Sequence, residues 1–292
     1  MSGEKKYIFI TGTSSGIGKV SAITLAKKGF HVFAGVRKQE DAENLKAENP
    51  DITPIFIDVT NQDSVNGAFN KISEITADKG LYGLVNNAGI AVAGPLEFLP
   101  IDRLRLQLEI NVIGQISVIQ KMLPLIRKGQ GRIINISSIA GFTAFPFKGA
   151  YAASKFAVEA LSDSLRRELR PWKIPISIVE PGVIKTPIWQ KSINLVEEIV
   201  AEMPSEAEKY YGAVYRNLLE RTLKRVERSG SAPEQVANAI FHALTSKKPK
   251  TRYLVGQDAH FLSKILTKLP DSLIDTFICK RVGLDKCEFE TN

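Results

Sequence analysis

The 292-residue sequence predicts an α/β fold, built on a doubly wound parallel sheet with a helical insertion and a C-terminal helical extension. Two observations support this prediction. Short apolar runs alternate with longer segments of helical periodicity over the first two-thirds of the chain, as in repeated βαβ units. Runs such as Ile133-Ile-Asn-Ile136 are apolar at nearly every position, which is typical of strands covered on both faces.

Seven strands are expected in chain order. They cover residues 7–10, 31–36, 55–58, 84–86, 132–136, 174–180 and 252–255. The first strand leads through a glycine-rich turn into a helix that ends at about Lys28. Segments 62–78 and 152–169 have helical periodicity and are long enough for the right-handed crossovers that join parallel strands. A doubly wound sheet follows from this order.

The strand and helix rhythm changes after Gly182. About fifty residues pass before Pro233 begins a further helix, 234–244, and an insertion of this length in a compact α/β domain is either functional or disordered. One helical face inside it is apolar or aromatic, which favours an ordered helix. That face carries Tyr211, Tyr215, Leu218, Leu219, Thr222 and Val226. We therefore expect one domain over residues 1–258, with a helical lid at 187–231, and a helical extension at 259–292.

Composition narrows the class of protein. The net charge is +8, yet no arginine-rich arm or aromatic-interleaved basic stripe favours nucleic acid as a partner. Two cysteines, Cys279 and Cys287, cannot staple a chain of this size and are expected to be free thiols in a reducing compartment. The three histidines match no metal-ligand spacing, so no metal is expected. The first apolar run is too short for a signal peptide, and no apolar stretch reaches spanning length, which predicts a cytoplasmic protein.

A glycine-rich turn lies between the first strand and the first helix. It reads Thr11-Gly-Thr-Ser-Ser-Gly-Ile-Gly18. Glycines let the backbone approach a pyrophosphate, and the helix N-terminus supplies N–H groups and the positive end of a dipole. The alternative is a tight strand-to-helix turn that binds nothing. The spacing differs from the common G-x-G-x-x-G of dinucleotide-binding proteins.

The end of the second strand indicates which dinucleotide would bind. NAD-dependent enzymes place an acidic residue there for the ribose 2′-hydroxyl, whereas an arginine accommodates a 2′-phosphate. Here Val36 holds the acidic position, and Arg37 and Lys38 follow it. We therefore predict NADP(H) in preference to NAD(H). The alternative is that both cations simply belong to a solvated loop.

Tyr151 and Lys155 are four residues apart and share one face of a predicted helix. A nearby ammonium favours the phenolate, so the pattern predicts that Lys155 lowers the pKa of Tyr151. A surface pair on an amphipathic helix would have the same spacing. A serine doublet, Ser137-Ser138, ends the fifth strand, at the sheet edge where catalytic groups of open α/β folds gather. The position alone does not choose between the two serines.

The motifs together resemble those of the short-chain dehydrogenase/reductase family, whose fold is Rossmann-type. The glycine-rich turn, Asn86-Asn-Ala-Gly89, Asn111, the serine, the Tyr-x-x-x-Lys pair and Glu180-Pro-Gly182 occur in family order over about the first 190 residues. The resemblance implies an oxidoreductase that moves a hydride between NADP(H) and an alcohol or carbonyl. Its spacing to the tyrosine selects Ser138.

The resemblance also implies roles for single residues. Tyr151 would be the general acid/base, Ser138 would bind the substrate oxygen, and Lys155 would assist Tyr151 and hold the nicotinamide ribose. Asn111 would anchor a water linking Lys155 to solvent. The expected cofactor contacts are Gly12, Ser14, Ser15, Gly16, Ile17, Gly18, Arg37, Lys38, Asp58, Val59, Asn86, Ala88, Gly89, Tyr151, Lys155, Pro181, Gly182, Val183 and Thr186.

The substrate is expected to be an apolar alcohol or carbonyl. The segments expected to wall the pocket carry little charge, and the insertion and tail look like those of the retinol and hydroxysteroid dehydrogenase branch, so a steroid, retinoid or related lipid is favoured. The aromatic and apolar residues there are Phe142, Phe145, Phe147, Ile188 and Trp189; the expected substrate contacts are Ser138, Phe142, Phe145, Tyr151 and Trp189. These aromatics could equally serve only to pack the lid.

The tail, residues 261–284, combines an apolar helical face with basic residues. We expect it to pack within the molecule or in a homo-oligomer, a dimer or tetramer; the alternative is peripheral contact with an anionic membrane.

Two other function classes fit the motifs less well. A non-catalytic NADP(H)-binding redox sensor would use the same fold, but such proteins tend to lose the tyrosine or lysine. Epimerase or dehydratase chemistry is disfavoured by the short chain and the glycine spacing.

Overall fold

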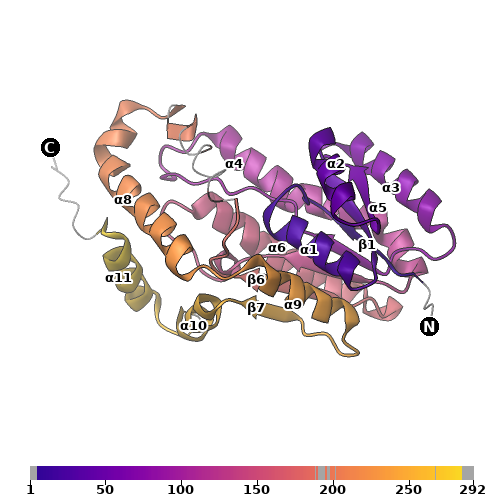
Figure 1. Ribbon diagram of the computed structural model, residues 1–292. Helices are drawn as coiled ribbons and strands as arrows, with labels where there is room; N and C mark the ends of the chain where they lie inside the picture. The colour runs from indigo at the N-terminus through magenta and orange to yellow at the C-terminus, as the bar shows by residue number, and fades with distance from the viewer. Residues whose placement is uncertain are drawn as a thin grey trace.

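A seven-stranded parallel sheet forms the centre of the protein, as a computed structural model describes it over residues 5–187, 189, 195, 198–200, 202–266 and 268–284. The strand order is β3-β2-β1-β4-β5-β6-β7, and every neighbouring pair is parallel. The chain therefore winds outward from β1 in one direction and then from β4 in the other. This is the doubly wound α/β fold expected from the sequence, with helices on both faces (Figure 1).

The strands lie close to the expected ranges. They are β1 Tyr7–Ile10, β2 His31–Val36, β3 Ile52–Phe56, β4 Gly83–Asn86, β5 Arg132–Ile136, β6 Ile176–Pro181 and β7 Arg252–Val255. The prediction for β3 was shifted toward the C-terminus, so Asp58 lies beyond the strand, in the loop before the next helix. Strand β6 begins two residues later than predicted, directly after Pro175, whose ring nitrogen has no hydrogen to donate to the ladder.

Helices connect the strands and extend beyond them. They are α1 Gly16–Lys27, α2 Gln39–Glu48, α3 Gln62–Thr76, α4 Ile101–Leu108, α5 Gly114–Lys128, α6 Gly149–Glu168, α8 Ser205–Ser229, α9 Pro233–Thr245, α10 Gln257–Leu266 and α11 Asp271–Val282. A π-helical turn, Glu109–Ile113, joins α4 to α5. Helix α6 begins three residues before the predicted start, so Tyr151 lies in its first turn.

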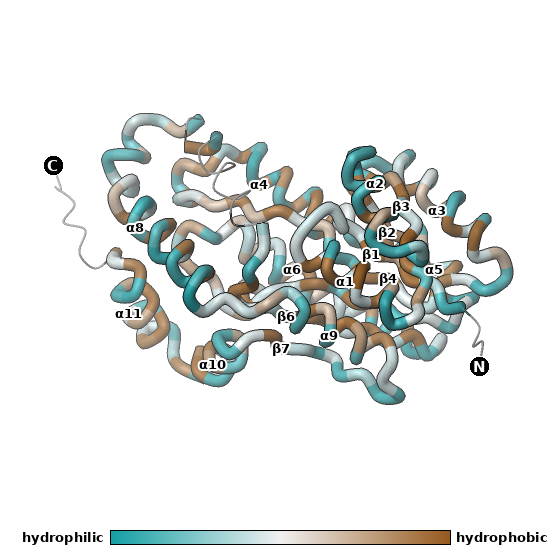
Figure 2. Tube along the Cα trace, in the orientation of Figure 1, coloured by the Kyte–Doolittle hydropathy of each residue, from teal (hydrophilic) through white to brown (hydrophobic). Residues whose placement is uncertain are grey.

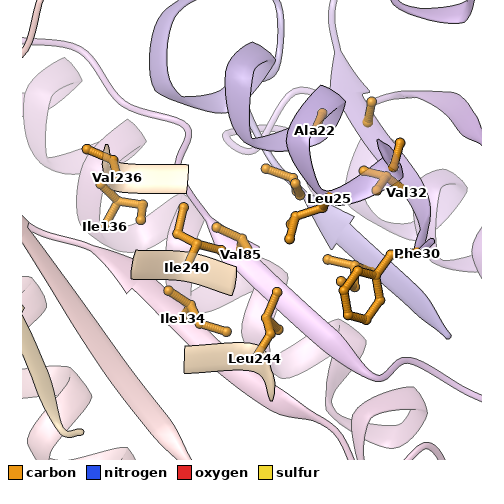
Figure 3. Packing of buried hydrophobic residues seen from close by; sticks show 14 of the residues in the cluster. Ala22, Leu25, Phe30, Val32, Val85, Ile134, Ile136, Val236, Ile240 and Leu244 are labelled. Carbon is orange, nitrogen blue, oxygen red and sulfur yellow. The ribbon is translucent and has the colours of Figure 1, made fainter. Parts of the chain in front are cut away.

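Two apolar layers, one on each face of the sheet, form the main core. Alternation along β1 divides them, because Ile8 and Ile10 belong to one layer and Phe9 to the other. The first layer is completed by α1, α2 and α9, and Figure 3 shows Leu25 of α1 and Ile240 of α9 in this layer. The second layer is completed by α3 and α5. Both faces of the central strands are therefore buried, which explains their continuous apolar sequence.

The insertion after β6 contains one long helix, α8. The start and the end of the insertion lie side by side, next to the sheet. Ser231 donates its N–H to Val183 O at 2.8 Å, and Lys185 donates to Ser231 O at 2.9 Å. Figure 1 places α8 and α11 at the end of the molecule far from α2 and α3, and Figure 2 shows mainly hydrophilic colours along α8. The insertion is thus anchored at its base, beside the carboxyl end of β6.

The tail forms two helices, α10 and α11, separated at Pro270. In the part of the chain that the structure describes, no helix combines the length and apolar character needed to cross a membrane. Within the same residues, no group of histidine, cysteine and acidic side chains is arranged to hold a metal ion. Cys279 in α11 forms no disulfide within the described residues, and Cys287 lies outside them.

Candidate active site

The glycine-rich turn between β1 and α1 packs directly against neighbouring loops. Gly12 has φ +69°, and a Cβ there would lie 2.7 Å from Ala88 Cα. Gly16 has φ +57°, and its Cβ would lie 3.2 Å from the Cβ of Thr186. Both positions favour glycine because L side chains rarely adopt this backbone conformation. The glycine-rich turn therefore meets the segments that follow β4 and β6. The first turn of helix α1 contains no acidic residue that would repel a phosphate.

Asn87 holds this turn in place, although the sequence analysis did not assign it a role. Its Nδ2 donates to Thr11 O at 3.0 Å and to Gly12 O at 2.9 Å. The N–H groups of Asn87 and Ala88 both donate to Thr11 Oγ1 at 3.0 Å. The neighbouring Asn86, which was expected to contact a cofactor, instead directs its side chain into the core, where Nδ2 donates to Asn135 Oδ1 at 3.0 Å. Any contact from Asn86 would come from its backbone.

We expect Asn87→Asp to lower the free energy of unfolding by about 2–4 kcal/mol, because a carboxylate would face two carbonyl oxygens with no hydrogen to donate. Urea denaturation followed by circular dichroism measures this difference. The matched control is Asn70→Asp, a change of the same chemistry at an exposed position of α3. Equal stability of the two variants would contradict the anchoring role of Asn87.

The ends of β2 and β3 form a basic surface next to the glycine-rich turn. Val36 is buried, whereas Arg37 and Lys38 are exposed, and neither cation has a hydrogen bond or ion pair to another described residue. Asp58 lies nearby: hydrogen bonds from Thr60, and then the positive charge of Arg37, lower the pKa of Asp58. The side chain of Val59 belongs to the core, so it can meet a ligand only through its backbone. A phosphate group would find two uncommitted cations here.

Tyr151 and Ser138 are brought together at the carboxyl edge of the sheet. Ser138 lies close enough to Tyr151 to lower the pKa of its phenol, and Ser138 Oγ accepts from Ala140 N at 3.2 Å. Ser137 has the opposite orientation: its hydroxyl is buried and has no partner among the described residues. The alternation of side chains along the extended backbone accounts for this difference. The geometry therefore selects Ser138 of the doublet, as the family spacing did.

The predicted lowering of the Tyr151 pKa is wrong for this structure. Burial raises the pKa of Tyr151, and the hydrogen bond from Ser138 offsets part of that effect. Lys155 Nζ lies 5.6 Å from the centroid of the tyrosine ring and donates to Ile136 O at 2.8 Å. The ammonium is thus directed toward a strand carbonyl, and its charge contributes little to lowering the pKa of Tyr151. Burial lowers the pKa of Lys155 itself to about 8, with Glu159 acting in the opposite direction.

Asn111 lies in the π-helical turn rather than in a regular helix. Its Oδ1 accepts from Ile90 N at 2.9 Å, and its Nδ2 donates to Ile90 O at 3.0 Å and to Ser154 Oγ at 3.2 Å. A Cβ at Gly89 would lie 3.2 Å from Asn111 Oδ1. Asn111 therefore ties the loop after β4 to α6, one residue before Lys155. A π-helical turn at this point re-aims its side chains relative to an α-helix.

The segment after β6 completes the edge. Asp258 of α10 accepts from Val183 N at 2.9 Å, and it packs so close to Gly182 that a Cβ there would lie 2.1 Å from its Oδ1. Pro181 O lies 3.5 Å from Ser138 Oγ. Thr186 faces Gly16 across the turn. No local sequence signal marks Asp258, because its partner Val183 lies 75 residues away along the chain.

The aromatic and apolar residues expected around the substrate pocket lie in different places. Phe142 and Phe145 are half-buried in the loop before α6. Trp189 donates its Nε1–H to Ile184 O at 2.7 Å, so its ring is fixed beside the segment after β6. Phe147 instead packs against α8, with its ring 5.2 Å from that of Tyr215. Ile188 lies outside the described residues.

The comparisons with known proteins decide the family. The family model of the short chain dehydrogenases matches residues 6–195. The chain is a short-chain dehydrogenase/reductase. It is 40% identical to bovine 17-beta-hydroxysteroid dehydrogenase type 6 over 95% of this chain and 89% of the relative. It is 36% identical to mouse retinol dehydrogenase 16 over 94% of this chain and 88% of the relative. This short-chain dehydrogenase/reductase thus belongs to the retinol and hydroxysteroid dehydrogenase branch.

Solved structures of the family share the fold. The structure of ElxO with NADP bound superposes with a TM-score of 0.68 at 27% identity, covering 86% of this chain and 96% of ElxO. The glycine-rich turn and the cations Arg37 and Lys38 suit the phosphate groups of a dinucleotide. The edge at Tyr151 suits its nicotinamide end.

Proposed function

We propose that this short-chain dehydrogenase/reductase interconverts an apolar carbonyl compound and its alcohol, with NADP(H) as the hydride carrier. The juxtaposition of Tyr151 and Ser138, with the buried Lys155 one helical turn after the tyrosine, is the observation that carries the proposal. An acid/base group next to an oxygen-binding hydroxyl suits proton transfer to a developing alkoxide. The bound nicotinamide would supply or accept the hydride.

The protonation state of Tyr151 favours donation of a proton. Because burial raises its pKa, the phenol is protonated at neutral pH and holds a proton for the substrate oxygen. In the reductive direction, the oxygen gains this proton as the carbonyl carbon gains the hydride, and Ser138 stabilises the same oxygen. Lys155, with a pKa near 8, is well matched to return a proton to Tyr151 afterwards. Asn111 would support this return by tying the loop at Ile90 to Ser154 of α6, next to Lys155.

The proposed preference for NADP(H) rests on the end of β2. A buried Val36 leaves no carboxylate to repel a 2′-phosphate, and Arg37 is uncommitted and exposed beside it. A guanidinium can pair with a phosphate through two parallel hydrogen bonds. ElxO, 27% identical to this chain, has been solved with NADP bound, which supports the same cofactor here. The proposal includes the other cofactor contacts expected from the sequence, with Asn86 and Val59 acting through their backbones.

The proposed substrate class is a bulky apolar alcohol or carbonyl, such as a steroid, retinoid or lipid. Phe142 and Phe145 lie in the loop shortly before Tyr151, the Trp189 ring lies beneath Lys148, and α8 would close over them as a lid. Relatives named for 17-beta-hydroxysteroids and retinol support this class. A cytoplasmic location and a homo-oligomeric state stay predictions, and peripheral membrane contact through α10 and α11 stays the alternative for the tail. A non-catalytic redox sensor remains the alternative function.

The test is a steady-state assay of NADPH and NADH oxidation at about 340 nm with steroid ketones, retinaldehyde and small aldehydes. We expect turnover with NADPH and a bulky apolar carbonyl, and at least about tenfold lower kcat/KM with a small aldehyde or with NADH. Tight NADPH binding without turnover of any carbonyl would favour the sensor instead. Equal use of both nucleotides would remove the cofactor preference.

A further inference from the structure

Two cations, Lys148 and Arg225, contact residues of the segment after β6 or their partners, and neither belongs to the proposed catalytic group. Lys148 is the residue before α6, and its Nζ lies 5.2 Å from the centroid of the Trp189 ring. Arg225 reaches the same region from α8, where its guanidinium lies 3.3 Å from Asp258 Oδ2. Asp258 in turn accepts from Val183 N. Arg225 is therefore anchored through Asp258 next to Gly182, and Lys148 lies directly before the helix that carries Tyr151.

Lys148 has no acidic partner there. In the described part of the chain, its Nζ makes no hydrogen bond or ion pair, and Arg225 is the charged group that acts on it. Burial, and to a lesser degree the charge of Arg225, lower the pKa of Lys148 to about 8. Arg225 is likewise partly desolvated and lies near Arg281 as well as Asp258. Among the described residues that act on these two cations, Asp258 alone is negative.

The local backbone holds Lys148 in this position. Phe147 has φ +65°, a left-handed conformation that is costly for an aromatic residue, and its carbonyl accepts from Gly94 N at 2.8 Å. Its ring is buried against Tyr211 and Tyr215 of α8. Strain of this kind persists where the surroundings hold it, and it concentrates at binding sites. Lys148 is thus presented rigidly, at the start of the helix that carries Tyr151 three residues later.

We propose that Lys148 and Arg225 bind an acidic group on the substrate, so that the preferred substrate is an apolar carbonyl compound that also carries a carboxylate, sulfonate or sulfate. This inference rests on the proposed function and narrows its substrate class. An anion would neutralise two cations that repel each other, and ion-assisted hydrogen bonds in a partly desolvated site are among the strong ones. The Trp189 ring beneath Lys148 would pack against the apolar body of the substrate.

The test compares matched substrates with and without charge. The pairs are a keto-steroid carboxylic acid and its methyl ester, and an ω-oxo fatty acid and its methyl ester, each assayed with saturating NADPH. We expect wild-type kcat/KM for the acids to exceed that for the esters by at least about tenfold. Lys148→Met, which keeps an apolar chain over Trp189, should lower kcat/KM for the acids about ten- to hundredfold and leave the esters within about twofold.

Three controls make the result specific. Lys148→Arg should retain the preference for acids, and Lys247→Met, an exposed lysine after α9, should match the wild type. The dissociation constant of NADPH should be unchanged in Lys148→Met. A weaker NADPH complex would assign the cation to the cofactor and overturn the proposal. Equal wild-type kcat/KM for acid and ester, or an equal loss for both in Lys148→Met, would overturn it as well.

A binding experiment separates this proposal from the proposed function. Calorimetric titration of a saturated steroid carboxylic acid, which has no reactive carbonyl, into the NADPH-loaded protein should show binding that Lys148→Met weakens about ten- to hundredfold. If no carbonyl compound is turned over but this binding persists, the oxidoreductase function fails and the anion site stands. If esters are reduced but the acid does not bind, the anion site fails and the function stands.

Discussion

Replacing Tyr151 by phenylalanine is expected to lower kcat by about 10²–10⁴-fold, because the variant lacks the hydroxyl that exchanges a proton with the substrate oxygen. The phenyl ring fills the same volume, so the half-buried site keeps its packing and NADPH binding should stay within about twofold. Ser138 alone would remain to stabilise the developing alkoxide. Steady-state turnover with the best carbonyl substrate, together with NADPH fluorescence titration, measures both quantities.

The control for this experiment is Tyr82→Phe. Tyr82 donates its hydroxyl to Leu244 O at 2.9 Å, away from the catalytic edge, so its loss should affect stability and leave kcat near the wild-type value. Unchanged turnover in Tyr151→Phe would remove Tyr151 from the chemistry. A parallel loss of NADPH affinity would instead indicate that the hydroxyl supports the cofactor site.

Arg37→Asp is expected to change the nucleotide preference by about 10²–10³-fold, measured as the ratio of kcat/KM for NADPH to that for NADH. The substitution removes a guanidinium that can pair with the 2′-phosphate and puts a carboxylate in its place, which repels the phosphate and can accept from a ribose hydroxyl. The loss should fall on NADPH, while NADH is unaffected or improved. The nearby Asp58 would lose the positive charge that helps to keep its pKa low.

An exposed arginine elsewhere tests whether the effect is local. Arg105→Asp on α4 changes the net charge by the same amount, and its side chain is 75% exposed. It should leave the nucleotide ratio within about twofold, because exposed charges are screened over about 10 Å. A similar fall in activity with both nucleotides in Arg37→Asp would mean that Arg37 acts on the loop structure and not on the phosphate.

The fold and much of the candidate site were accessible from sequence, because they depend on local patterns. Apolar runs at strand length predicted all seven strands, and only β3 was misplaced by more than two residues, since its apolar run continues through Ile57 past the end of the ladder. The glycine-rich turn, Tyr151 and Lys155 were identifiable because their spacing is itself the signal. The comparisons then established the family that those motifs predicted.

The tertiary structure decided what depends on contacts between distant segments. Burial of Tyr151, where α6 meets the end of β5, reverses the direction of the pKa shift that the Tyr-x-x-x-Lys spacing predicts. Likewise, Asp258, Arg225 and Lys148 come from three elements that are remote in sequence. Hydrophobic periodicity along the sequence indicates which face of a helix or strand is buried. Which charge lies opposite another is determined only when the chain has folded, because long-range packing sets burial and direction.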